Sequence, residues 1–135
     1  MRVSRPTSLE ERDTPHVNPE KAAIAISNAP GEGELIRVAA LFRLLGDATR
    51  ARLLYSLLEA GELCVSDLAA VTDTPEATVS QALRLMRTAG IVTGRRSGRN
   101  VFYRLSDAHV RLLLDVTREH VLHDAKTRDQ GRSLP

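Results

Sequence analysis

The segment SDLAAVTDTPEATVSQALRLMRTAG, residues 66–90, constrains the fold of this chain more than any other feature. Ser66 is of a type that caps helices, and Thr74-Pro75 pairs another cap with a proline at a first helical position. Gly90 ends the second helical pattern. Two helices joined by so short a turn match a helix-turn-helix, whose second helix enters the major groove of DNA. A helical hairpin without a DNA-binding role is the alternative.

The second helix of this pair has one apolar and one polar side. Val79, Leu83 and Met86 recur at helical spacing and are predicted to face the core. The outward and flanking positions carry side chains that reach base edges and phosphates. These candidate DNA contacts are Thr78, Ser80, Gln81 and Arg84.

A β-hairpin is predicted directly after the helix pair. Residues 92–96 and 100–104 read as two strands, and residues 97–99 form the turn. A helix-turn-helix followed by a hairpin with an arginine-rich tip is the plan of a winged helix. The hairpin would then place more cations beside the DNA backbone or minor groove. Its candidate contacts are Arg95, Arg96, Arg99 and Asn100.

Charge is distributed unevenly along the chain. The net charge is only +2, but residues 77–106 contain no Asp or Glu and include six arginines. A basic segment inside a near-neutral chain is expected of a nucleic-acid-binding face. The alternative is a solvated surface with scattered ion pairs.

The rest of the sequence predicts one domain between two flexible tails. The tails are expected at residues 1–18 and 126–135, and the domain at residues 19–125. Asn18-Pro19 opens a first helix through about Ser27, and a second helix spans residues 34–45. Asp47 caps a third helix that ends near Gly61, with core candidates Leu53, Leu54, Leu57 and Leu58.

Composition agrees with a helical core. Hydrophobic residues make up 42% of the chain and aromatic residues only 3%. We expect a mainly α fold with a small β-hairpin. No apolar run reaches the roughly 18 residues that a membrane span needs, and no signal-peptide pattern is present. We therefore expect a cytoplasmic protein without a membrane partner. The sequence also shows neither a nucleophile–base pair nor a glycine-rich phosphate loop, so an enzyme is not expected.

Potential metal ligands stand at both ends of a predicted final helix. His109 and His120 are separated by about 16 Å of helix at 1.5 Å per residue. Zinc holds imidazole nitrogens at about 2.0 to 2.1 Å, so one helix cannot close a site from both of its own ends. Spaced at helical periodicity, His109, Leu113, Val116, His120 and His123 fall on one broad stripe, which suits a helix–helix interface.

The chain resembles the ArsR/SmtB family of metal-responsive winged-helix repressors. The resemblance rests on the order and spacing of four stretches: LFRLLGDATRARLLYSLL, ELCVSDLA, TVSQALRLMRTAGIV and GRRSGRNVFYRLSDAHV. It implies a homodimer that binds double-stranded operator DNA with an inverted repeat. It also implies release on binding metal, which derepresses genes for metal efflux or sequestration.

One metal-site pattern of this family is D-x-H, ten residues, then H-x-x-H on the last helix. The sequence carries it at Asp107, His109, His120 and His123. If two final helices pair antiparallel across a two-fold axis, the first two ligands of one protomer meet the last two of its partner. Asp107 reaches such a site only from a non-helical junction, and it can instead serve only to favour the helix N-terminus. Nitrogen and carboxylate ligands suit zinc, with cobalt or nickel as alternatives.

A second family pattern uses thiolates on the first helix of the helix-turn-helix. Here only Cys64 is present, so a soft-metal site is doubtful, although Cys64 with Asp67 and His16 matches part of a mixed second site. A small buried cysteine is the simpler interpretation. The alternative function is a winged-helix repressor that responds to oxidation at Cys64 or to a small organic ligand, with structural histidines.

Overall fold

The computed structural model describes residues 17–132 of the chain. The chain divides into two compact units, residues 1–40 and 41–135. The first contains α2 (Pro19–Asn28) and most of α3 (Glu32–Leu45). The Asn18 side chain accepts a hydrogen bond from the backbone N–H of Lys21, which confirms the predicted cap. Helix α3 begins two residues before its expected start, so Gly33 lies in its first turn.

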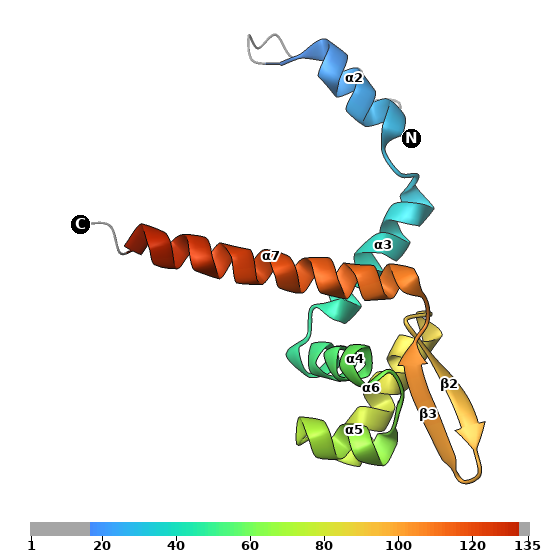
Figure 1. The fold of residues 1–135 in the computed structure, drawn as a ribbon. Coiled ribbons are helices and arrows are strands. Elements are labelled where there is room, and N and C mark those ends of the chain that lie inside the picture. The colour runs from blue at the N-terminus through green and yellow to red at the C-terminus, as the bar shows by residue number, and fades with distance from the viewer. Residues whose placement is uncertain (1–16, 133–135) are drawn as a thin grey trace. The chain divides into compact units, whose positions relative to one another are not determined.

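The second unit is a helical body with a small sheet. Its order is α4 (Ala48–Ala60), β1 (Leu63–Cys64), α5 (Val65–Thr72), α6 (Glu76–Thr88), β2 (Val92–Ser97), β3 (Asn100–Leu105) and α7 (Ala108–Arg132). The sheet is antiparallel in the order β1-β3-β2. Figure 1 shows β2 and β3 side by side as a hairpin. This is the winged helix-turn-helix that the sequence predicted, with β1 as an additional short strand.

The core of the second unit lies where α4, α5 and α6 meet the base of the hairpin. It is built from aliphatic side chains at helical spacing, as the low aromatic content predicts. Its fully buried members are Leu53, Leu54, Leu57, Leu68, Val79, Leu83, Met86, Ile91 and Val92. Leu58 is partly buried against this cluster. The predicted inward face of α6 is therefore confirmed.

Two predicted helix caps are wrong. Helix α5 begins at Val65, ahead of Ser66, and its N-cap Cys64 makes no side-chain capping bond. The N-cap of α6 is Pro75, and the Thr74 hydroxyl donates instead to the Thr72 carbonyl oxygen at 3.1 Å. The backbone is fixed by the pairing of β1 with β3 just before α5, and by the tight turn just before α6. Neither helix therefore uses a capping side chain.

Helix α7 is longer than the sequence predicted. It continues to Arg132 through residues expected to form a flexible tail from 126 onward. Residues 124–132 contain no proline, and Arg128 pairs with Asp124 one turn earlier at 3.2 Å. Opposite charges at this spacing support an exposed helix. The same helix is anchored to the body near its start, where Leu114 is 6% exposed.

Candidate functional site

Helix α6 presents a polar surface opposite its buried face. Thr78, Gln81 and Arg84 are exposed, and Ser80 is half-buried at the flank. Thr78 and Gln81 also line a hollow of 290 Å³ that they share with Asp47, Thr49 and Arg50 at the start of α4. The predicted candidates on α6 are thus on one accessible side, with donors and acceptors available to a ligand in front of the helix.

The turn between α5 and α6 sets the direction of α6. Asp73 adopts a left-handed conformation with φ 50°, and its backbone N–H points at the carbonyl oxygens of Ala69 and Ala70. The backbone N–H of Thr74 donates to the Ala69 oxygen at 3.0 Å. Asp is one of the few non-glycine residues that visits this region readily. The first three residues of α6 after this turn, Glu76, Ala77 and Thr78, are exposed.

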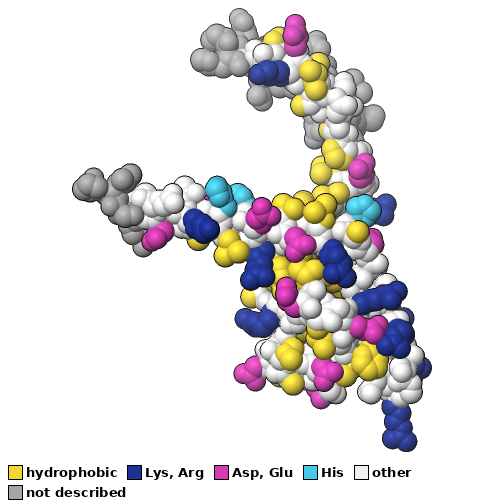
Figure 2. Space-filling view, in the orientation of Figure 1, with side chains coloured by type: hydrophobic (Ala, Val, Ile, Leu, Met, Phe, Trp, Pro, Cys, Tyr) yellow, Lys and Arg dark blue, Asp and Glu magenta, His cyan; other side chains and the backbone are white. Residues whose placement is uncertain are grey.

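The β2–β3 hairpin, called the wing below, ends in a two-residue turn. Gly98 has φ 64°, and Ser97 pairs with Asn100 across the turn. Glycine at the first central position is typical of a tight hairpin turn whose twist matches its strands. Arg96, Arg99 and Asn100 are exposed, and Figure 2 shows basic side chains along the hairpin and at its tip.

Arg95 differs from the other candidate DNA contacts. Its Nη2 and Nε donate to the two carboxylate oxygens of Glu62 at 2.7 and 3.1 Å. Its guanidinium also lies over the Phe102 ring, 5.2 Å from the centroid. The hydrogen bond from Arg95 lowers the pKa of the Glu62 carboxyl, and Glu62 raises the pKa of Arg95.

The remaining candidate arginines carry no such partner. Within residues 17–132, Arg84, Arg96 and Arg99 form no ion pair with a carboxylate. Their charges are not neutralised locally. They are therefore available to phosphate groups of a nucleic acid.

Asp107 and His109 lie together at the start of α7. Asp107 precedes the helix, and one of its carboxylate oxygens accepts the backbone N–H of Val110 at 3.1 Å. The same oxygen is 3.7 Å from Nδ1 of His109. The His109 side chain is 95% exposed. The structure therefore has Asp107 at the non-helical junction that a ligand role requires, and also in the capping role that was the alternative.

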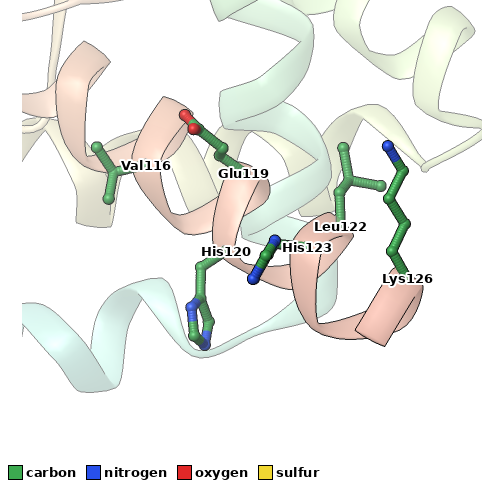
Figure 3. A pocket seen from close by; sticks show the side chains of 6 residues that line it. All are labelled: Val116, Glu119, His120, Leu122, His123 and Lys126. Carbon is green, nitrogen blue, oxygen red and sulfur yellow. The ribbon is translucent and has the colours of Figure 1, made fainter. Parts of the chain in front are cut away.

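His120 and His123 lie together farther along α7. Both are exposed and line an open hollow of 560 Å³ with Val116, Glu119, Leu122 and Lys126. Figure 3 shows the two imidazole rings next to each other, whereas the Glu119 carboxylate points away from both. A pair of neighbouring imidazoles is half of a tetrahedral metal site.

The structure does not bring the two pairs together within one chain. Among residues 17–132, no group of three or more His, Cys, Asp or Glu side chains is placed to hold a metal ion. Figure 2 shows the histidines in two separate groups along α7. A second copy of the chain is needed if all four side chains bind one ion.

Cys64 has a different environment from the histidines. It is 9% exposed, and its Sγ lies 3.4 Å from a carboxylate oxygen of Asp67. His16, the third member of the predicted second site, lies outside the described residues. Burial fits the interpretation of Cys64 as a small core residue.

Sequence reasoning missed Glu62, the partner of Arg95. The two residues are 33 positions apart, and no local pattern links them. The only available signal was the apolar Leu63-Cys64-Val65 after Gly61, from which a short third strand could have been expected. Pairing of Leu63 with Tyr103 brings Glu62 to the wing.

The helices of the described residues offer no span for a lipid bilayer, since none is both long and apolar enough.

The family model and the relatives that match this chain all describe regulatory proteins. Residues 47–93 match the model of the family described as bacterial regulatory protein, arsR family. The chain is 38% identical over 99 residues to the HTH-type transcriptional repressor SmtB of Mycobacterium tuberculosis, covering 72% of each protein. It is 42% identical over 78 residues to a homolog of the cadmium resistance transcriptional regulatory protein CadC from Staphylococcus aureus. That match covers 58% of this chain and 64% of the relative.

One similar protein of known structure provides a comparison of the fold and has a described assembly. It is the solution structure of a homodimeric winged helix-turn-helix DNA-binding domain from Mycobacterium bovis, described as a possible ArsR-family transcriptional regulator. The identity is 25%, the TM-score is 0.62, and the match covers 86% of this chain and 95% of that one. The α6 and wing surfaces described above therefore lie in a fold of the DNA-binding type.

Proposed function

Because the chain belongs to the ArsR family of bacterial regulatory proteins, we propose that it is a transcriptional repressor that binds operator DNA when metal-free and leaves it on binding zinc. A regulatory family also agrees with the prediction that the chain is not an enzyme. The observation that carries the zinc proposal is the placement of Asp107 and His109 beside each other at one end of the exposed α7 surface, with His120 and His123 beside each other farther along.

The DNA-binding part of the proposal uses α6 and the wing. Helix α6 enters the major groove, where Gln81 reads base edges and Arg84 meets a phosphate. The wing reaches the adjacent backbone or minor groove. Its free cations Arg96 and Arg99 supply the attraction that does not depend on sequence. Thr78, Ser80 and Asn100 complete the proposed contact set as short polar donors and acceptors.

The proposed assembly is a homodimer formed through α7. Among its exposed apolar side chains, Leu112 is 62% and Val116 52% exposed, and Val121 and Leu122 are similarly uncovered. Of these, Leu112 and Val116 are one helical turn apart on the side of α7 that carries the histidines, and exposed apolar side chains grouped in this way usually mark an interaction surface. The M. bovis neighbour of the same fold is described as homodimeric. A two-fold axis then predicts an operator with an inverted repeat.

The same pairing completes the metal site. Antiparallel α7 helices put Asp107 and His109 of one protomer beside His120 and His123 of the partner, and the symmetry makes two equivalent sites. The donor set fits zinc, because three imidazoles and one carboxylate supply a tetrahedral N/O site. Cobalt is accepted by the same donors, and nickel would need additional ligands.

Thiolate chemistry is less well supported for this chain. The staphylococcal relative is named for cadmium resistance, but the chain has a single cysteine, which is buried. One thiolate cannot build a soft-metal cage within one chain. The burial of Cys64 also counts against its oxidation as the signal, since reactive thiols are accessible.

The response to zinc is a change in DNA binding that arises from residues of the chain itself. The ligands are on α7 and the DNA contacts on α6 and the wing, so zinc acts by favouring one arrangement of the two protomers rather than by occupying the DNA surface. The histidine and aspartate side chains bind the ion better in the arrangement whose α6 helices do not suit successive major grooves. Reciprocity then requires that DNA weakens zinc binding by the same factor by which zinc weakens DNA binding.

Operator titration of the purified dimer tests this function. Fluorescence anisotropy of labelled operator DNA is measured with chelator, then with zinc, cobalt, nickel and cadmium in turn. We expect tight binding with chelator, a coupling of about 1 to 3 kcal/mol with zinc or cobalt, and a weaker effect of cadmium. Operator binding that no metal changes would refute the sensing proposal and leave the DNA-binding proposal standing.

A further inference from the structure

The two faces of the wing have different neighbours. Side chains alternate between the faces of a strand, so Val92, Gly94 and Arg96 share one face of β2. This face meets the body, because Val92 is 1% exposed and a Cβ built on Gly94 would lie 3.6 Å from Nη1 of Arg87 on α6. Arg95 lies on the opposite face, paired with Phe102 of β3. Arg95 therefore points away from the side on which the wing meets α6.

The Arg95 guanidinium is bound on that opposite face. Glu62 receives both of its hydrogen bonds, in the two-pronged geometry that makes an Arg–carboxylate pair stronger than a single contact. The planar guanidinium of Arg95 lies over the Phe102 ring. Glu62 itself directly follows Gly61, which caps the end of α4. Arg95 thus connects strand β2 of the wing to the end of a core helix.

We propose that Arg95 is a positioning residue that fixes the wing to the body through Glu62 and does not contact DNA. The phosphate contacts of the wing then come from Arg96 and Arg99, which carry no carboxylate partner among the described residues. The inference rests on operator binding by the α6–wing surface and does not depend on which metal the protein senses.

The two possible roles of Arg95 predict opposite effects on operator affinity when the Glu62 side chain is removed. If Arg95 bound a phosphate, Glu62 would compete with the DNA, and its removal would tighten binding. If Arg95 positions the wing, removal of Glu62 loosens the wing and weakens binding. The Glu62 side chain is 30% exposed and the Arg95 side chain 54%, so the pair is screened and the expected effect is small.

The experiment compares Arg95→Ala, Glu62→Ala, their double variant and the swap of Glu62→Arg with Arg95→Glu. Operator affinity is measured by anisotropy over a series of salt concentrations, with chelator present throughout. We expect each single variant to weaken binding about two- to fivefold, the double variant to weaken it no further, and the swap to recover part of the loss. The slope of log affinity against log salt should stay at the wild-type value in Arg95→Ala.

Amide hydrogen exchange of the free protein provides a readout without DNA. Exchange of the β2 and β3 amides should become faster in Arg95→Ala and in Glu62→Ala, and unchanged exchange in both variants would overturn the proposal. Tighter operator binding by Glu62→Ala, or a salt slope reduced by about 0.9 in Arg95→Ala, would also overturn it, because either result indicates a phosphate contact. Since no metal is present, a failure of zinc sensing changes neither readout.

Discussion

The hydroxyl of Tyr55 on α4 donates a hydrogen bond of 2.7 Å to the backbone carbonyl oxygen of Leu114 on α7. Leu114 is buried, and Tyr55 is half-buried beside it. Helix α4 belongs to the core that holds α5 and α6, whereas α7 carries the proposed metal ligands. This bond is therefore a direct link between the DNA-binding body and the helix on which we expect zinc to act.

Tyr55→Phe removes this bond and leaves the ring in place. We expect a loss of about 1 kcal/mol in the free energy of unfolding, typical of one hydrogen bond in a folded protein. The factor by which zinc weakens operator binding should also decrease, because α7 is less firmly tied to the body. Urea unfolding and operator titration measure the two effects.

Tyr103 supplies a matched control for this variant. It is the only other tyrosine of the chain, and its hydroxyl makes no hydrogen bond with residues 17–132. Tyr103→Phe should therefore leave the free energy of unfolding nearly unchanged. Equal losses in the two variants would show that the Tyr55–Leu114 bond contributes nothing of its own.

The turn of the wing depends on Gly98. Its φ of 64° is in the left-handed region, and a Cβ built there meets no atom within 4 Å. The cost of Gly98→Ala is then purely one of backbone conformation, roughly 1–2 kcal/mol. Hydrogen exchange at residues 97 and 100 should accelerate, and operator affinity should fall. Gly98→Asn is the control, because Asn tolerates this region better, and an alanine variant that behaves like the asparagine variant would contradict the argument.

The free arginines should report phosphate contacts through their salt dependence. Arg84→Ala and Arg96→Ala should each weaken operator binding and reduce the salt slope by about 0.9. The reason is that a protein with one phosphate contact fewer releases fewer counterions from the DNA when it binds. Arg118, exposed on α7, is the control whose replacement by alanine should leave the slope unchanged. Wild-type slopes in both test variants would mean that the DNA surface is placed wrongly.

Local patterns predicted most of the elements but not their long-range pairing. The inward positions of α6 follow from helical spacing, and the wing follows from alternation between two turn signals. By contrast, β1 is two residues long and exists because Leu63 and Cys64 pair with β3. That pairing is formed across about 40 residues of sequence, and a stretch of two residues has no periodicity of its own to reveal it.

The candidate site also combines features that local patterns predict with features that depend on tertiary structure. The sequence places His109 and His120 on one helix and predicts that a second chain joins them, which stays a prediction. Among residues 17–132, no three potential ligands lie together to hold a metal ion. The sequence predicts Arg95 as a DNA contact together with the other wing arginines, because composition does not distinguish one arginine from another. Which arginine is paired depends on strand parity and on the position of Glu62, and both are set by tertiary structure.

Metal sensing should require both ends of α7, but from different chains. His109→Ala and His120→Ala should each remove tight zinc binding and zinc-driven release as homodimers, and metal-free operator binding should remain. Both side chains are exposed, so neither substitution creates a core cavity. Arg118→Ala, at an exposed position on the side of α7 opposite the histidines, is the control for general effects on this helix, and its zinc stoichiometry should equal that of the wild type.

A mixed dimer of the two histidine variants decides between ligation within and between protomers. Each protomer carries a different affinity tag, so the heterodimer is isolated by two successive purifications. One of its two symmetric sites then keeps both histidines, and the other loses both. We expect one tight zinc ion per mixed dimer, measured by competition with a chromophoric chelator. If His109 and His120 of the same chain bound the metal together, every protomer in the mixture would lack a ligand, and absence of tight zinc binding in the mixed dimer would refute the intersubunit site.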